Sequence, residues 1–274
     1  RLSLVGSEMC IRDRFEREME DAALAFERFT DTEIDRRRYT LGFSSSPIRR
    51  FTFSGRYRRN YRDSHYGHKE DTEPGYSAFI NRQELDTEEI ATKVSARMTS
   101  AVKATFQYKR VKTGVETLSQ TTPPSSVESG DYVADIYNIG VTATPIPSVY
   151  LTGLFSYWDI NSESFDNESA TVTGYDGDLY SFIGTAGWAV DKKTDLTLEY
   201  LFSRSDNFQN SSADGLPLGI DNIRHGFSLG CSRRLNDKVQ AQFQYGFYRY
   251  DEDSNGGADN YKAHLLGAGL EFRF

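Results

Sequence analysis

Apolar and polar residues alternate along most of the chain with a period of two. From Val239 to Phe247 every second residue is apolar or aromatic, and the residues between them are glutamines and a glycine. Successive side chains of a β-strand point to opposite faces, so the pattern predicts a strand with one apolar and one polar face. The pattern ends at Arg249, where a charge on the apolar face is tolerated only near the edge of an apolar environment.

About eleven such segments follow one another, each about 9 to 14 residues long, which is enough to cross the apolar band of an outer membrane at a tilt near 40°. Further examples are Phe51 to Tyr57, Ile90 to Met98, Val102 to Tyr108, Tyr180 to Val190 and Leu196 to Phe202. No stretch approaches the roughly 18 to 20 consecutive apolar residues of a membrane helix, so the sequence excludes a helical membrane protein.

The connections between these segments alternate in length. The short ones are Ser46-Pro47, Thr99-Ser100, Pro145 to Pro147, Asp191 to Thr194 and Leu235 to Asp237. The long polar ones are 62–88, 112–130, 160–177, 206–221 and 251–259. An up-and-down sheet then has all its short turns at one end, as outer-membrane barrels do. The alternative is a soluble β-sandwich, which has strands of about 5 to 6 residues and no such asymmetry.

Residues 36–274 are therefore predicted to be all-β, forming an antiparallel up-and-down transmembrane β-barrel with long extracellular loops and short periplasmic turns. Single-chain bacterial barrels have even strand numbers and both ends in the periplasm, so a count of about eleven predicts an incomplete barrel truncated at its N-terminal side. Residues 15–35 are expected to form an extracellular loop or short helix, with a degraded strand pair as the alternative.

Residues 1–14, RLSLVGSEMCIRDR, resemble a translated sequencing-adapter scar and are expected to be a non-native leader; an ordinary disordered leader is the alternative. Setting them aside removes Cys10 and leaves Cys231 as the one cysteine, so the sequence predicts no disulfide and no cysteine-based metal site. The pair His65 and His68 is expected to be solvated, because its spacing alone does not define a metal site.

Composition agrees with a sheet that has two different faces. Aromatic residues make up 14% of the chain, with 17 Tyr and 18 Phe, while the mean hydropathy is −0.60. The 32 basic and 40 acidic residues give a net charge of −8, which argues against a nucleic-acid partner. Two Asp-rich segments, from Asp159 and from Asp251, are expected to be solvated loops because they lack the ligand spacing of an EF-hand.

The polar faces of the first strands carry a set of basic residues that we call the basic wall. Its members are Arg38, Arg50, Arg56, Arg58, Lys93, Arg97, Lys103 and Lys109. Facing a lumen, this wall favours anions or an acidic partner; alternatively, its charges pair with acidic groups elsewhere in the barrel. On the apolar faces, an aromatic girdle at the membrane interfaces is predicted from Tyr108, Tyr157, Trp188, Tyr200, Tyr245 and Phe247.

An enzymatic role is not expected. His264 has Asp259 near it in sequence, but no GxSxG elbow or similar signature marks a nucleophile. The sequence therefore predicts neither catalytic residues, nor a metal site, nor a cofactor.

The chain ends in a pattern of alternate apolar residues with a terminal aromatic, namely Leu266, Ala268, Leu270, Phe272 and Phe274. This pattern resembles the C-terminal β-signal of bacterial outer-membrane proteins, which the barrel-assembly machinery reads. The resemblance implies that this machinery is a partner and that Phe274 lies in the periplasm.

The region from about residue 36 to Phe274 resembles the C-terminal part of large bacterial outer-membrane barrels. Its Tyr- and Asp-rich hairpin tips, Tyr245 to Tyr261 and Leu154 to Ser164, are similar to those of MtrB/PioB-type porins, which sheath a multihaem cytochrome. The resemblance implies a porin-like passive conduit or sheath in the bacterial outer membrane, in contact with its lipid and with a periplasmic or lumenal cytochrome as partner. Two alternatives stay open: a receptor or adhesin that binds through its long loops, and an anion-preferring solute channel.

Overall fold

The computed structural model describes residues 2–19, 26–68, 79–120, 126–163, 175–207, 209–211, 216–218, 221–254 and 256–272. The strands are β1 (Leu2–Met19), β2 (Phe26–Ile48), β3 (Phe51–His68), β4 (Phe79–Arg97), β5 (Val102–Gln120), β6 (Ser126–Ile146), β7 (Val149–Glu163), β8 (Tyr175–Ala189), β9 (Thr194–Asp206), β10 (Gln209–Ser211), β11 (Leu216–Leu218), β12 (Asn222–Arg234), β13 (Val239–Glu252) and β14 (Tyr261–Phe272). Within these ranges, no helix is long and apolar enough to cross a membrane.

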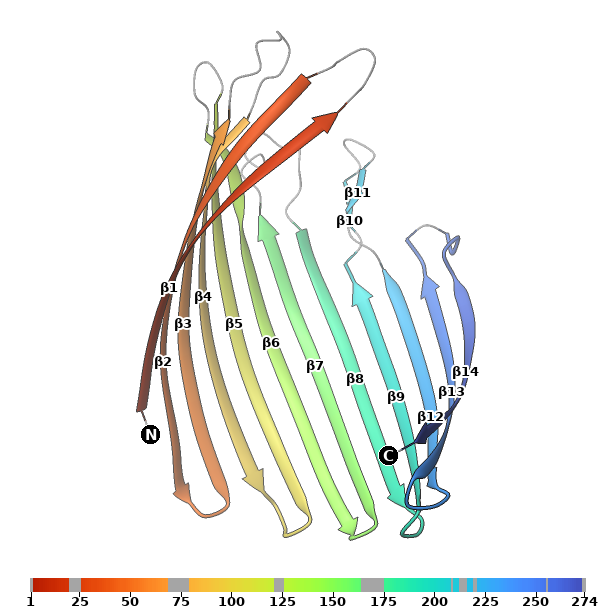
Figure 1. The fold of residues 1–274 in the computed structure, drawn as a ribbon. Coiled ribbons are helices and arrows are strands. Elements are labelled where there is room, and N and C mark those ends of the chain that lie inside the picture. The colour runs from red at the N-terminus through yellow and green to blue at the C-terminus, as the bar shows by residue number, and fades with distance from the viewer. Residues whose placement is uncertain are drawn as a thin grey trace.

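Twelve of these strands form a single antiparallel sheet in which chain neighbours pair, in the order β1 to β9 and then β12 to β14 (Figure 1). The strands β10 and β11 form a separate small hairpin in the long connection between β9 and β12. The prediction of an all-β, antiparallel, up-and-down sheet is confirmed.

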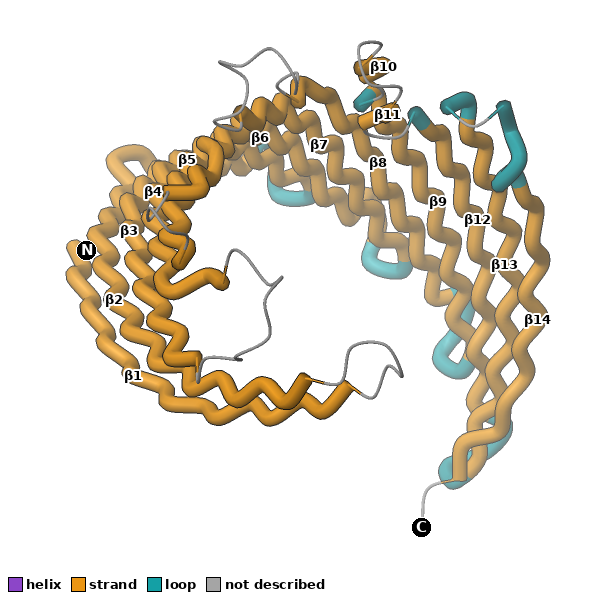
Figure 2. The backbone as a smooth tube through the Cα atoms, turned by 90° about the horizontal axis from the view of Figure 1, so that it is seen from above, coloured by secondary structure: helices purple, strands orange, loops and turns teal. Residues whose placement is uncertain are grey.

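The sheet is strongly curved, and it is open. Seen from above, it bends into a trough whose two edges are β1 and β14 (Figure 2). Within the described residues, β1 pairs only with β2, and β14 pairs only with β13. Each edge therefore presents a row of backbone groups without a hydrogen-bonded strand.

The N-terminal region differs from the sequence prediction. Residues 15–19 lie in β1 and residues 26–35 lie in β2, so the expected loop or short helix over 15–35 is wrong for these residues. Residues 2–14 also lie in β1, which pairs with β2 along its whole length. Eleven strands of the main sheet, β2 to β9 and β12 to β14, match the predicted count of about eleven, and β1 is a twelfth strand outside residues 36–274. Alternation did not reveal the N-terminal part of β2 because charged residues occupy both of its faces from Asp35 to Arg38, so no period of two is visible there.

Three of the short turns share one geometry, in which a backbone N–H donates to the carbonyl oxygen four residues later at 2.9 Å. The pairs are Met98 to Val102, Val190 to Thr194 and Leu235 to Val239. The residue after each donor accepts a backbone hydrogen bond through its side-chain oxygen: Thr99 from Ala101 at 3.1 Å, Asp191 from Lys193 at 2.7 Å, and Asn236 from Lys238 at 2.9 Å. Thr, Asp and Asn favour such turns because their side chains replace a backbone acceptor.

Candidate functional site

Strand register assigns each side chain to one of two faces, because residues directly opposite each other in an antiparallel pair share a face. One face carries the aromatic and aliphatic residues, and we call it the apolar face. Its members include Phe106, Ile139, Phe155 and Phe182, which lie directly opposite one another across β5 to β8. The other, polar face carries Gln107, Asn138, Ser156 and Ser181 in the neighbouring row.

The apolar face is exposed over its whole width. Leu151 on β7 is 41% exposed, Phe227 on β12 is 37% exposed, and Leu266 on β14 is 71% exposed. No second sheet covers this face in the described part of the chain. A soluble sandwich would bury such residues between its sheets, whereas an outer-membrane barrel turns them toward lipid. The sandwich alternative is therefore excluded.

Side chains on the polar face are more buried than those on the apolar face. Of the nine buried non-glycine side chains on the described strands, eight lie on the polar face, and Asp63 is the exception. Ala134 is 1% exposed and Ile136 is 3% exposed, although no second layer of the described strands covers the sheet there. Crowding of one face is what bending a sheet produces on its concave side, so the polar face lines the trough seen in Figure 2.

The six predicted girdle residues all lie on the apolar face. Two of them belong to a row of four tyrosines that crosses four strands, Tyr108, Tyr137, Tyr157 and Tyr180, with ring centroids 4.9 to 6.0 Å apart. Two others touch histidines: the hydroxyl of Tyr200 is 2.9 Å from His225 Nδ1, and that of Tyr245 is 2.9 Å from His264 Nδ1. The sequence did not reveal Tyr137, Tyr180 or these two histidines as partners, because cross-strand register decides which residues meet.

A row of aspartates lies immediately on the loop side of the tyrosine row. It consists of Asp135, Asp159, Asp178 and Asp206, each directly opposite the next. The hydroxyl of Tyr157 donates to Asp178 at 2.8 Å, which joins the two rows. Burial, followed by the nearby charges of Asp178 and Asp176, raises the pKa of Asp159. The apolar surface therefore stops at the tyrosines on these strands.

The segment from Asp159 was expected to be a loop, but residues 159–163 belong to β7. Nowhere in the described structure do three His, Cys, Asp or Glu side chains gather as a metal site would require. The His65 imidazole lies against Asp63, and the side chain of His68 lies outside those that the structure describes.

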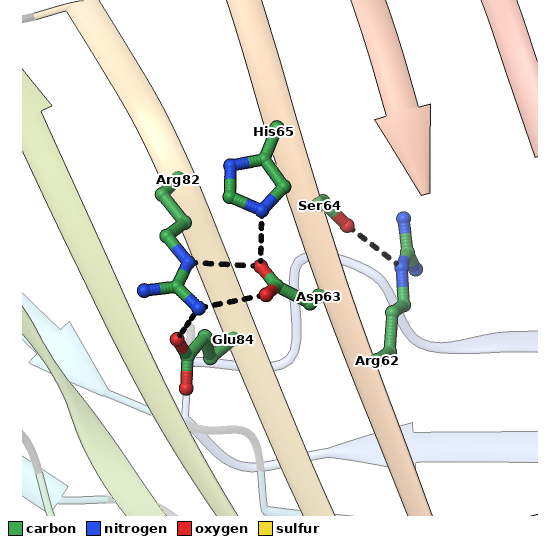
Figure 3. Close-up of polar contacts among 6 residues, drawn as sticks. All are labelled: Arg62, Asp63, Ser64, His65, Arg82 and Glu84. Carbon is green, nitrogen blue, oxygen red and sulfur yellow. Dashed lines mark hydrogen bonds and ion pairs between the residues drawn. The ribbon is translucent and has the colours of Figure 1, made fainter. Parts of the chain in front are cut away.

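Charged residues replace apolar ones toward the loop ends of β3 and β4 as well. On the apolar face of β3, Arg59 follows Tyr57, and Tyr61 and Asp63 come next, so charged residues alternate with the last aromatic one. Farther along, Arg82 donates to both carboxylate oxygens of Asp63, at 3.0 and 2.7 Å, and also pairs with Glu84 (Figure 3). His65 Nε2 lies 3.3 Å from the same Asp63. The two hydrogen bonds from Arg82 lower the pKa of Asp63 below its ordinary value.

Register brings the strand members of the basic wall to the polar face of β2 to β5, and Arg50 lies in the turn between β2 and β3. Arg56 and Arg58 pair with Glu89 at 2.5 and 3.8 Å, and Arg38 donates to Asn60 at 2.8 Å. No ion pair joins Lys93, Arg97, Lys103 or Lys109 to any side chain that the structure describes. Part of the wall is thus neutralised within the sheet and part of it is not.

The C-terminal pattern can be placed only in part. Leu266, Ala268, Leu270 and Phe272 lie on the apolar face of β14, opposite Tyr245, Phe243, Ala241 and Val239. Phe274 lies outside the described residues. The role of this pattern as an assembly signal stays a prediction.

Comparisons with known proteins support the fold and nothing narrower. Neither a family model nor a curated protein matches the sequence. Among solved structures, the ferric citrate transporter FecA aligns with a TM-score of 0.52 at 12% identity, over 88% of this chain and 39% of that one. OmpT of Vibrio cholerae aligns at 9% identity over 99% and 98% of the two chains (TM-score 0.41), and the NalP translocator domain of Neisseria meningitidis at 12% over 100% and 88% (TM-score 0.33). The FecA alignment together with the two-faced sheet gives this chain the fold of outer-membrane β-barrels, with the sheet open.

Proposed function

We propose that this protein is a porin-like conduit of the bacterial outer membrane, with lipid against its apolar face and water against its polar face. The observation that carries the proposal is the difference between the two faces. Large apolar side chains stand 36 to 71% exposed, mostly on one face, while the opposite face carries hydroxyl, amide and basic groups. This arrangement is stable only where one side of the sheet meets hydrocarbon and the other meets water.

A conduit needs a closed wall. Unpaired strand edges in lipid leave backbone groups without hydrogen bonds, which costs several kcal/mol for each group. We therefore infer that the outer edges of β1 and β14 pair in the membrane, either with each other or with further strands. The tyrosine row then lies at the outer interface, and the three short turns described above lie on the periplasmic side.

The unpaired part of the basic wall gives such a conduit a preference for anions. Lys93, Arg97, Lys103 and Lys109 contribute four positive charges on β4 and β5 of the polar face. Among the described residues near them on this face, the acidic one is Glu89, which Arg56 and Arg58 already neutralise. Rings or walls of one sign raise the local concentration of the opposite ion.

The test is ion selectivity in planar lipid bilayers containing the purified full chain. A potassium chloride gradient is expected to give a reversal potential that indicates greater permeability to chloride than to potassium. The double variant Lys93→Gln, Lys103→Gln is expected to bring the permeability ratio toward one. Arg110→Gln removes a positive charge from the apolar face and is the matched control. Absence of any conductance, or the same selectivity in all three proteins, contradicts the proposal.

The expectations of a sheath around a multihaem cytochrome and of a receptor acting through long loops stay predictions. A large part of the loops on which a receptor would depend, including residues 69–78 and 164–174, lies outside the described residues.

A further inference from the structure

The polar face contains a row of large apolar side chains, which we call the apolar stripe. It consists of Leu154 on β7, Ile183 on β8, Leu201 on β9 and Tyr248 on β13. Leu154, Ile183 and Leu201 lie directly opposite one another in the register. Gly226 on β12 lies opposite both Leu201 and Tyr248, and so continues the row between them.

Gly226 lets the stripe continue as one surface. A Cβ atom placed on this glycine would stand 3.3 Å from Leu201 Cβ and 3.3 Å from the ring of Tyr248. The ring of Tyr248 therefore packs against Gly226. It occupies part of the space between β9 and β13 that a side chain at position 226 would otherwise fill.

The stripe is accessible, and polar rows border it on both sides. Leu154 is 44% exposed, Ile183 is 41% exposed and Tyr248 is 37% exposed. The row on its loop side consists of Asn138, Ser156, Ser181, Ser203 and Arg224, and the row on its turn side consists of Thr142, Thr152, Thr185, Glu199 and Ser228. An exposed apolar patch with a polar rim is typical of a ligand-binding surface.

The unpaired lysines of the basic wall lie on the same face, at one end of the stripe. Lys93 belongs to the row on the loop side and Lys103 to the row on the turn side, two to three strands away from Leu154. At about 4.8 Å per strand, the strands that carry these lysines lie about 10 to 14 Å from the strand of Leu154. Charges of both signs lie farther along the stripe, because Glu199 and Asp195 on β9 are on its turn side and Arg224 on β12 is on its loop side, whereas the end at Lys93 and Lys103 carries only positive charges among the described residues bordering the stripe.

We propose that the concave face binds amphipathic anions, namely alkyl or aryl carboxylates and sulfonates. The anionic head lies between Lys93 and Lys103, and the hydrocarbon part lies along Leu154, Ile183 and Leu201. This class has both an anionic group for the lysines and a hydrocarbon part for the apolar stripe. Inorganic anions would leave the stripe unused, and neutral sugars would leave the lysines unused. The inference rests on the proposed function in one respect, because the concave face must be open to solutes in water.

The probes are octanesulfonate and methanesulfonate, which share a head group and differ in chain length. Added to the full chain in planar bilayers, octanesulfonate is expected to reduce the current at a concentration at least about tenfold lower than methanesulfonate, since burial of two methylene groups already corresponds to about tenfold in affinity. Replacing the stripe with Leu154→Thr and Ile183→Thr is expected to remove most of this difference. Val115→Thr, on the same face toward the loop end of β5, is the matched control and is expected to retain it.

Binding is measured separately by calorimetry on the chain in lipid nanodiscs, which requires no conductance. Two results would overturn this inference without contradicting the proposed conduit. In the first, the protein conducts ions but the two sulfonates reduce the current equally. In the second, the Leu154→Thr, Ile183→Thr variant still responds more strongly to octanesulfonate than to methanesulfonate. Stripe-dependent binding without conductance supports the site and contradicts the conduit. Equal block by the neutral detergent octyl glucoside, or no effect of Lys93→Gln with Lys103→Gln, contradicts the anionic part of the proposal.

Discussion

Tyr157 and Asp178 mark the place where the apolar face gives way to charge. The tyrosine ring stacks on Tyr180 with centroids 4.9 Å apart, and its hydroxyl donates to the carboxylate. A tyrosine suits this position because its ring is apolar while its hydroxyl needs a polar partner. In the proposed conduit, single residues of this kind limit how far the sheet enters the membrane.

Removing the Tyr157 hydroxyl tests how much its hydrogen bond to Asp178 contributes to the stability of the fold. Tyr157→Phe is expected to lower the free energy of unfolding by about 1 kcal/mol, because the Asp178 carboxylate loses a hydrogen bond. Tyr137→Phe is the control, since no hydrogen bond of the Tyr137 hydroxyl is found within the described structure. Urea titration of both variants in lipid vesicles measures the difference; equal losses would mean that the hydroxyl acts through something other than Asp178.

Asp63 gives a second residue-scale prediction, in the part of β3 that lies beyond the apolar face. Arg82 lowers its pKa, so the ionised form stabilises the fold, and this contribution is present above the ordinary aspartate pKa and is lost as pH falls through the lowered value. Asp63→Asn is therefore expected to lower the denaturation midpoint at pH 7 and to have little effect near pH 2.

Unfolding curves at both pH values measure this effect. Asp131→Asn serves as control, because the Asp131 and Lys112 side chains are both 55% exposed at a separation of 3.4 Å and contribute little at either pH. An Asp63→Asn effect that is independent of pH would show that Arg82 does not hold the ionised carboxylate.

At the scale of the strand, the sequence was informative wherever one face was apolar. Alternation predicted the apolar and polar residues of β13 correctly, and register confirms the same assignment for Tyr108, Trp188 and Tyr200. It could not locate the loop ends of β3 to β6, where both faces are polar and the period disappears. It also missed the partners of Asp63 and the apolar stripe, because both depend on which residues of neighbouring strands lie opposite each other.

The two faces of β7 differ in what they tolerate. Leu151→Lys places a charge on the apolar face and is expected to destabilise the folded protein by about 2 kcal/mol in a bilayer. Thr152→Lys places the same charge on the polar face one residue later and is expected to cost much less, because that side chain meets water. Folded fractions after urea titration in lipid vesicles measure both; similar losses in the two variants would contradict the assignment of faces.

For the whole molecule, the twelve-stranded sheet is a curved wall with an apolar outside and a polar, partly basic inside. Neither hydropathy nor composition describes this arrangement, because the mean hydropathy of −0.60 averages two faces of opposite character. Closure of the wall was beyond sequence reasoning as well, since alternation describes single strands and contains no information about which edge meets which.

The most direct test of the two-faced wall is nitroxide scanning along β7 in lipid bilayers, with Cys10 and Cys231 replaced by serine. Labels at Leu151, Gly153 and Phe155 are expected to collide with dissolved oxygen, which concentrates in lipid. Labels at Thr152, Leu154 and Ser156 are expected to collide with a water-soluble nickel complex. Accessibilities that alternate with a period of two support the account; aqueous accessibility on both faces would contradict it.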